Sequence, residues 1–249
     1  MALVRLDKLL ADQGIATRKE LKTIIRSGRV QVDGQTVKVP ETKLDPAACR
    51  VTVDGAELKL ARHHYYMMDK PEGVVTATED SRQGTVLDLV TDEMRRMGLF
   101  PVGRLDKDTS GLLLLTDDGD FAHRVISPKS CVEKLYYAVV AGEVGEEDVT
   151  AFSRGIVLGD GTACLPAKLE PLGNSACLVT VVEGKYHQVK RMLAARGKQV
   201  QKLRRLSIGG LSLDENSVPG TWRELDDEDL CRLFSDHPMG NLSKNFRFF

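Results

Sequence analysis

The densest group of residues that could do chemistry is a polar loop bounded by glycines. Asp106 lies in residues 103–111, which read GRLDKDTSG, and an apolar run at 112–115 follows directly. A loop held against a buried strand can fix a carboxylate at the rim of a sheet, as a catalytic carboxylate requires. Carboxylates in such loops are more often caps or ion-pair partners, so the loop alone leaves both interpretations open.

A second group is basic and lies in residues 183–192, EGKYHQVKRM. If a helix begins near His187, then His187, Lys190 and Arg191 share one face and the apolar residues between them pack on the other. Such a face can neutralise phosphates or orient a carboxylate, and Lys185 precedes it in the same segment. His187 has no second histidine or carboxylate at ligand spacing, so we expect no metal site.

A third group places two tyrosines on a strand. Residues 134–140 read KLYYAVV and include Tyr136. By residue type alone, core packing with the hydroxyl at the surface is the usual role of a tyrosine in such a strand.

The amino-terminal part shows the elements of a small separate unit. Residues 6–11 and 19–27 are predicted to form helices, with a turn between them and Thr17 as the cap of the second. Alternating valines on both sides of Asp33 and Gly34 then predict a β-hairpin. Two short helices followed by a hairpin make a compact unit that ends near residue 60.

The second helix of this unit should carry a basic face. Steps of four, four and three residues align Arg18, Lys22, Arg26 and Arg29, opposite an apolar stripe. This face suits a phosphate backbone, although a solvated helix face has the same pattern. The basic residues available to RNA in this unit are Arg5, Lys8, Arg18, Lys19, Lys22, Arg26 and Arg29.

The remainder of the chain predicts an α+β domain. Strand-like runs are expected at 65–68, 112–116, 135–140, 177–182 and 206–213, and helices at 86–97, 118–125 and 188–196. Strands interspersed irregularly with helices favour a mainly antiparallel mixed sheet with flanking helices. We find neither a Walker nor a Rossmann glycine pattern.

The charge distribution, the apolar runs and the cysteines indicate what the protein binds and where it is located. The 249 residues carry a formal net charge of -1, yet eight basic residues and no acidic residue lie between Lys185 and Arg205, where we expect cations for the substrate. There is no signal peptide and no apolar run long enough for a bilayer, so we expect a cytoplasmic protein without membrane contact. Five widely spaced cysteines are typical of reduced, packed thiols.

Two resemblances to known families indicate a function for these groups of residues. The stretch RLDKLLADQGIATRKELKTIIRSGRVQVDG resembles the S4 RNA-binding domain. The strings DKPEGVV, GRLDKDTSGLLLLTDDG, KLYYAVV and EGKYHQVKRMLAA follow in the order found in bacterial pseudouridine synthases of the ribosomal small-subunit type, the RsuA family. The resemblance runs from about residue 4 to about 230. The YHQVKRM segment is more similar to the small-subunit enzymes than to their large-subunit relatives.

The resemblance implies a role for each group. Asp106 would be the nucleophile, and the resemblance is compatible with its attack on either the base or the sugar. Tyr136 would stack on the flipped base and move a proton, and Lys190 would pair with the aspartate. Arg104 would hold the displaced backbone, and Arg191, His187 and Lys185 would bind the substrate. Lys70 and Pro71 match a structural motif. Isomerisation needs no redox change and no added group, so no cofactor is expected.

The sequence therefore predicts a small amino-terminal S4-like domain at residues 1–60, a linker at 61–64, a pseudouridine synthase catalytic domain at 65–235 and a carboxy-terminal tail at 236–249. The expected activity is conversion of a uridine to pseudouridine in 16S ribosomal RNA, with the RNA or the assembling small subunit as partner and the enzyme as a monomer. Two alternatives stay open. One is a 23S target, and the other is a catalytically silent assembly factor that binds ribosomal RNA.

Overall fold

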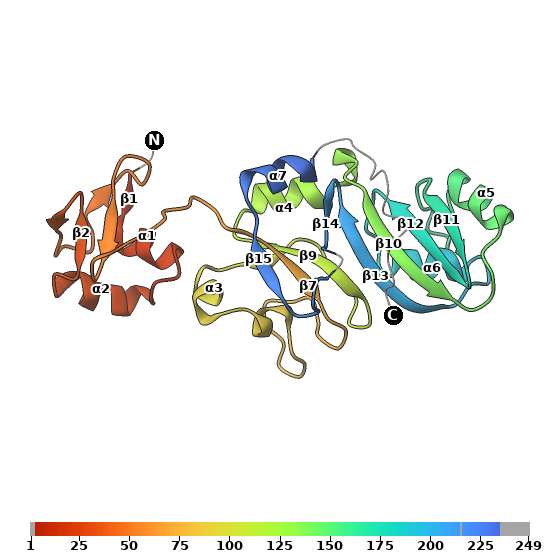
Figure 1. Ribbon diagram of the computed structural model, residues 1–249, viewed down its shortest axis with the longest axis horizontal. Coiled ribbons are helices and arrows are strands. Elements are labelled where there is room, and N and C mark those ends of the chain that lie inside the picture. The colour runs from red at the N-terminus through yellow and green to blue at the C-terminus, as the bar shows by residue number, and fades with distance from the viewer. Residues whose placement is uncertain (1–2, 215, 235–249) are drawn as a thin grey trace. The chain divides into compact units, whose positions relative to one another are not determined.

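The chain forms two compact units, as a computed structural model of residues 3–214 and 216–234 shows (Figure 1). One unit comprises the residues up to His64 together with Val90–Phe100, and the other comprises Tyr65–Leu89 together with the residues from Pro101 onward. The tail predicted at 236–249 lies outside the described residues. Within the described part, no helix has both the length and the apolar character that crossing a membrane requires.

The amino-terminal unit has the predicted helix–helix–hairpin order. Thr17 caps the second helix in a full capping box with Glu20, which confirms the predicted start of that helix. The turn at Asp33 and Gly34 is also confirmed, but the return strand is shorter than predicted and leaves Val39 exposed. The elements are β1 (Val4–Arg5), α1 (Leu6–Asp12), α2 (Arg18–Arg26), β2 (Val30–Val32), β3 (Gln35–Thr36), β4 (Lys43–Leu44), β5 (Val51–Val53), β6 (Ala56–Glu57) and α3 (Asp92–Arg96).

Two small sheets and one core hold this unit together. β1 pairs with β4, and a second, antiparallel sheet has the order β3-β2-β5-β6. Leu21 and Ile25 of α2 are fully buried among the leucines of α1 and the valines of β2 and β5. Because these two residues fix which face of α2 points inward, the basic residues of α2 must face outward.

The larger unit is built on one mixed sheet. Its strands follow the order β11-β12-β10-β13-β9-β7-β15, β14 pairs with β13, and only the β13–β9 pairing along this path is parallel. The predicted α+β fold with a mainly antiparallel sheet is therefore confirmed. The strands are β7 (Tyr65–Lys70), β9 (Ser110–Thr116), β10 (Lys134–Val140), β11 (Lys168–Gly173), β12 (Ala176–Val181), β13 (Val200–Ile208), β14 (Leu211–Ser212) and β15 (Trp222–Glu224), with β8 (Phe100–Pro101) at the boundary between the units.

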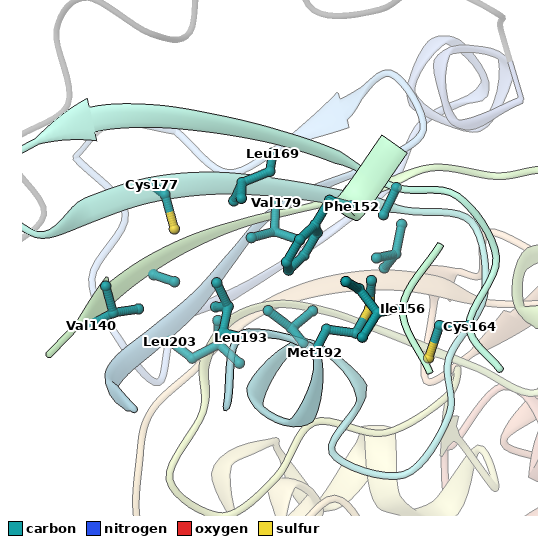
Figure 2. Close-up of a cluster of buried hydrophobic side chains, with 14 of the residues drawn as sticks. Val140, Phe152, Ile156, Cys164, Leu169, Cys177, Val179, Met192, Leu193 and Leu203 are labelled. Carbon is teal, nitrogen blue, oxygen red and sulfur yellow. The ribbon is translucent and has the colours of Figure 1, made fainter. Parts of the chain in front are cut away.

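Helices cover the sheet and complete its cores. They are η1 (Val86–Leu89), α4 (Gly119–Ile126), η2 (Pro128–Ser130), α5 (Glu146–Arg154), α6 (Gln188–Ala194) and α7 (Asp227–Leu233). Figure 2 shows Phe152 of α5 and Met192 and Leu193 of α6 among Val140 and Val179 of the strands. Since α6 is anchored by its buried apolar side, its polar side is held at a fixed position relative to the sheet.

Two predicted elements are wrong. Residues 86–97 do not form one helix, because Thr91 adopts an extended conformation and caps α3 through the Met94 amide, which separates α3 from η1. Residues 206–213 do not form one strand, because the chain turns at Gly209 between β13 and β14. A Cβ at Gly209 would lie 1.9 Å from the Leu233 carbonyl oxygen, so only glycine fits there.

Candidate active site

The loop that carries Asp106 is held from beneath by a buried lysine. Lys70, at the end of β7, has no exposed surface and donates hydrogen bonds to the carbonyl oxygens of Pro71, Asp106 and Thr109 at 2.9 to 3.1 Å. Burial lowers the pKa of Lys70 to about 8. This ammonium donates to three carbonyls at once and fixes the backbone at Asp106 and at Thr109.

Further contacts hold the same loop. The Thr76 hydroxyl donates to the Leu105 carbonyl at 2.7 Å and accepts from the Leu105 amide at 3.2 Å. Gly111 follows the loop with a φ of +109°, and a Cβ there would lie 2.2 Å from the Arg205 carbonyl oxygen. Glycine is therefore required where β9 and β13 meet in their parallel pairing.

Two basic side chains from the start of α6 converge on the Asp106 carboxylate. Lys190 Nζ lies 3.0 Å from Asp106 Oδ2, and His187 Nε2 lies 3.3 Å from Asp106 Oδ1. Lys190 also donates to Asp108 Oδ1 at 2.6 Å, so its ammonium bridges two carboxylates of one loop. The Asp106 side chain remains 26% exposed and can still be reached by a ligand.

Charge pairing within this group changes two pKa values. Partial burial by itself would lower the pKa of Lys190, but the hydrogen bonds to Asp108 and Asp106 outweigh it, and the pKa is raised. The hydrogen bond from Lys190 in turn lowers the pKa of Asp108. The lysine therefore stays cationic at neutral pH and can orient Asp106.

The predicted shared face of His187, Lys190 and Arg191 is only partly correct. His187 is the N-cap of α6 in a left-handed conformation, with φ 48° and ψ 34°, which turns its ring toward Asp106. Arg191 points elsewhere and forms an ion pair with Asp160 at 2.6 Å. Hydrogen bonds with Thr162 and with Arg191 lower the pKa of Asp160 to about 2.

A pocket of about 740 Å³ opens beside Asp106. Tyr136 of β10 lines it, and the Tyr136 hydroxyl lies 3.5 Å from Arg205 NH1. Of the predicted substrate-binding residues, Arg104, Lys185 and His187 line the pocket, whereas Arg191 does not. Lys190 contacts Asp106 without lining the pocket. Arg104 is exposed and makes no ion pair within the described residues, while Lys185 is paired with Glu183.

The lining of the pocket includes two buried cations, Lys134 and Arg205. Lys134 is two residues before Tyr136 on β10 and donates to the Val132 and Val182 carbonyls. Burial, together with the charge of Arg205, lowers the pKa of Lys134 to about 8. Arg205 is only 4% exposed and donates to the Leu112 carbonyl at 2.7 Å. Neither cation forms an ion pair with a carboxylate of the described chain, so this part of the pocket favours electron-rich groups.

The basic run between Lys185 and Arg205 is less available than the sequence suggested. Arg204 is paired with buried Asp69 at 2.6 Å, and Arg196 and Lys198 both contact Asp148. Asp69 of β7 and Asp148 of α5, both distant in the sequence, therefore neutralise three of the eight cations of this run. The expectation that it supplies free cations to the substrate is wrong for these residues.

The seven basic residues of the amino-terminal unit that were predicted to bind RNA divide into two groups. Arg5 and Arg18 contact the buried Asp7, whose pKa the Arg5 hydrogen bond lowers, and Arg29 pairs with Asp54. The other four are exposed and form no ion pair with any described residue. They are Lys8, Lys19, Lys22 and Arg26.

Sequence reasoning assigned no role to several residues of the site. Asp108 and Lys134 lie in the motifs that were recognised, and their charge next to Asp106 and Tyr136 was the available signal. Arg205 was included only as the last residue of the basic run, because its place in the pocket depends on the pairing of β13 with β9 and β10. Among the described residues, no group of three or more His, Cys, Asp or Glu side chains could hold a metal ion.

Comparison with known families identifies both units. Residues 64–195 match the model of the RNA pseudouridylate synthase family, and residues 4–48 match the S4 domain. The first match includes Asp106, Tyr136 and Lys190, and the second includes α1 and α2.

Similar proteins extend over nearly the whole chain. An uncharacterised RNA pseudouridine synthase of Bacillus subtilis is 46% identical over 92% of this chain and 98% of its own length. A protein of Vibrio cholerae named ribosomal small subunit pseudouridine synthase A is 44% identical over 93% of this chain and 100% of its own. A crystal structure of a pseudouridylate synthase superposes with a TM-score of 0.65 at 36% identity, covering 92% of this chain and 99% of that one.

Proposed function

This chain belongs to the RNA pseudouridylate synthase family, and from that premise we propose that it isomerises a uridine of small-subunit ribosomal RNA with Asp106 as the nucleophile. The observation that carries the proposal is the convergence of Lys190 and His187 on one partly exposed carboxylate, at a pocket that Tyr136 also lines. A carboxylate held at both oxygens by cationic or polar partners is oriented before a substrate arrives.

The target uridine must leave its base stack to reach this pocket. Extrusion of a nucleotide costs a few kcal/mol, and stacking on an aromatic ring offsets part of that cost. Tyr136 supplies the ring inside the pocket, and exposed Arg104 supplies a cation at the same pocket for the displaced backbone.

The reaction rearranges one bond of the uridine. Asp106 adds to the nucleotide, at the base or at the sugar, and the bond between N1 of uracil and C1′ of ribose breaks. The freed uracil rotates, C5 bonds to C1′, the proton on C5 is removed, N1 gains a proton, and Asp106 is released. Tyr136 lies close enough to the pocket to move a proton. Buried Lys134 and Arg205 favour the electron-rich uracil while it is detached.

The small ribosomal subunit is the proposed source of the RNA. Two relatives, 44% and 42% identical over 93% of this chain, carry the name ribosomal small subunit pseudouridine synthase A. The S4 domain supports RNA as the ligand, and its exposed cations on α1 and α2 suit contact with phosphates. We further propose a cytoplasmic monomer with the S4-like domain at 1–60, a linker at 61–64 and the catalytic domain at 65–235.

One variant tests the nucleophile and the target together. Asp106→Asn should abolish pseudouridine formation and leave RNA affinity within about threefold, because it removes the nucleophile and not the groups that bind RNA. Ribosomal RNA from cells lacking the protein is mapped for pseudouridine after complementation with wild type, Asp106→Asn or Asp108→Asn. One 16S position should be restored by wild type and not by Asp106→Asn. Restoration by Asp106→Asn would exclude Asp106 as the nucleophile, and a restored 23S position would move the target.

A further inference from the structure

Tyr186 presents a large exposed aromatic ring beside the pocket. Its side chain is 75% exposed, whereas the other four tyrosines are buried or half-buried. Tyr186 lines the same pocket as Asp106 and Tyr136. Aromatic rings contribute most when they are buried, so a ring left open beside a binding pocket is available for a ligand.

The ring of Tyr186 is stacked on its neighbour. Its centroid lies 3.8 Å from that of His187, with 20° between the two planes. The left-handed backbone of His187 is uncommon for a residue with a side chain, and such conformations cluster at functional sites. Because His187 also contacts Asp106 at 3.3 Å, the stack connects the rim of the pocket to the carboxylate.

Polar contacts hold the backbone of this stack in place. Arg191 NH1 donates to the Tyr186 carbonyl at 3.3 Å, while the same guanidinium is paired with Asp160. On the other side, the Lys185 amide donates to Gln188 Oε1 at 2.8 Å. The backbone that carries the stack is therefore fixed before any ligand arrives, which lowers the entropy lost on binding.

We propose that the stacked rings of Tyr186 and His187 are the platform for the unpaired RNA base next to the target uridine. This inference rests on the proposed function and adds a second nucleotide to the site. When the uridine enters the pocket, the base beside it loses a stacking partner, and the open face of Tyr186 replaces that partner at the rim. A purine offers a larger face than a pyrimidine, so a purine neighbour is preferred.

The platform should act on binding more than on chemistry. The neighbouring base does not react, so its stacking stabilises the bound substrate and the transition state equally. Such an interaction lowers KM and leaves kcat unchanged. Tyr186→Ala should raise KM about tenfold, the loss expected for one base–aromatic stack, with kcat within about twofold. Tyr186→Phe keeps the ring and should recover most of the loss.

The test uses RNA hairpins that contain the mapped uridine. KM by product formation and Kd by fluorescence anisotropy are measured for wild type, Tyr186→Ala, Tyr186→Phe and Leu172→Ala, the last removing an exposed apolar side chain of β11 outside the pocket. Two further hairpins carry an abasic ribose immediately before or after the uridine. On one of these two, wild type and Tyr186→Ala should have equal KM and Kd.

The outcomes separate this inference from the proposed function. Product from wild type and none from Asp106→Asn reports on the function alone. The platform is excluded if Tyr186→Ala binds and turns over the intact hairpin like wild type, or if its deficit persists undiminished on both abasic hairpins. A deficit in Leu172→Ala equal to that of Tyr186→Ala would also overturn it.

Discussion

Two stretches of the chain are rich in basic residues, and the fold uses them differently. On helix α2 of the amino-terminal unit, Lys19, Lys22 and Arg26 are exposed and have no ion-pair partner among the described residues. Between Lys185 and Arg205, acidic side chains of the catalytic unit contact most of the cations. These pairs are Lys185 with Glu183, Lys190 with Asp106 and Asp108, Arg191 with Asp160, Arg196 and Lys198 with Asp148, and Arg204 with Asp69.

A run of like charge in a sequence therefore shows that cations are present, but it does not show that they are free to bind a ligand. α2 is amphipathic, so burial of its apolar stripe necessarily exposes its cations. β13 is central in its sheet, and Arg204 meets Asp69 from a segment 135 residues away in the sequence. The element that carries a cation decides whether the cation is exposed or buried. The topology of the sheet decides which acidic side chain it meets.

The largest effect should come from the most buried pair. Asp69 has no exposed side-chain surface and Arg204 is 11% exposed, so Asp69→Ala would leave a mostly buried guanidinium without its counter-ion. We expect a loss of about 3 to 5 kcal/mol of unfolding free energy. Urea denaturation with an unchanged m value measures it. The double change Asp69→Leu with Arg204→Met should recover much of the loss, and a fully stable Asp69→Ala protein would show that water replaces the carboxylate.

A pH-dependent effect should come next, from Lys134. Its pKa is lowered from 10.5 to about 8 by burial and by the charge of Arg205. Well below pH 8 the folded and the unfolded chain both hold the proton on Lys134, so the free energy of unfolding does not change with pH through this group. From pH 8 to 10.5 the unfolded chain holds a proton that the folded chain has lost, so stability rises with pH.

Lys134→Met lacks this titration and supplies the comparison. Between pH 7.5 and pH 10, the stability of wild type should increase relative to Lys134→Met by about 2 to 3 kcal/mol. Lys70 has a pKa lowered in the same direction, but it is present in both proteins and cancels in the difference. Parallel stability curves would mean that Lys134 is solvated in the folded protein.

A third experiment addresses the exposed cations of α2. Replacement of Lys19, Lys22 and Arg26 by Gln should weaken binding to ribosomal RNA. The negative slope of log K against log salt should become shallower by about 2 to 3, because each phosphate contact contributes about 0.7 to 0.9 to its magnitude. Stability should not change. The matched double change Arg196→Gln with Lys198→Gln removes paired cations, so it should lower stability and leave the slope unchanged. An unaltered slope in the triple variant would mean that this face of α2 is only solvated.

The elements that could be predicted from the sequence are those whose signals are local. Thr17 and Glu20 form the capping box of α2 within four residues, and Asp33 and Gly34 specify a hairpin by themselves. The prediction of a single helix at 86–97 is wrong because the Thr91 side chain accepts a hydrogen bond from the Met94 amide and starts a separate helix there. Helix α5 was not predicted, although a capping aspartate, Asp148, stands at its start.

In the candidate site, too, the residues with a local sequence signal could be predicted and those placed by strand pairing could not. Asp106, Tyr136 and Lys190 were named from motifs, and the structure places Lys190 on Asp106 and both Asp106 and Tyr136 at one pocket. Arg205 could not be found in this way, because its place beside Tyr136 depends on the register of β13 against β10. Arg191 was expected to bind substrate, but its partner Asp160 is 31 residues away on a loop that no motif marks.

The smallest expected effect comes from the exposed counterpart of the Asp69 pair. Asp160 and Arg191 lie at the same 2.6 Å as Asp69 and Arg204, but their side chains are 55% and 29% exposed. Water can solvate either group when the other is removed, so Asp160→Ala should lower the urea midpoint far less than Asp69→Ala. The two substitutions remove the same side chain from ion pairs of the same length, and Asp160→Ala additionally removes the hydrogen bond that Asp160 accepts from the Thr162 amide, so a smaller loss in Asp160→Ala is due to its exposure. Equal losses would contradict the claim that burial, and not charge pairing itself, makes the two basic stretches different.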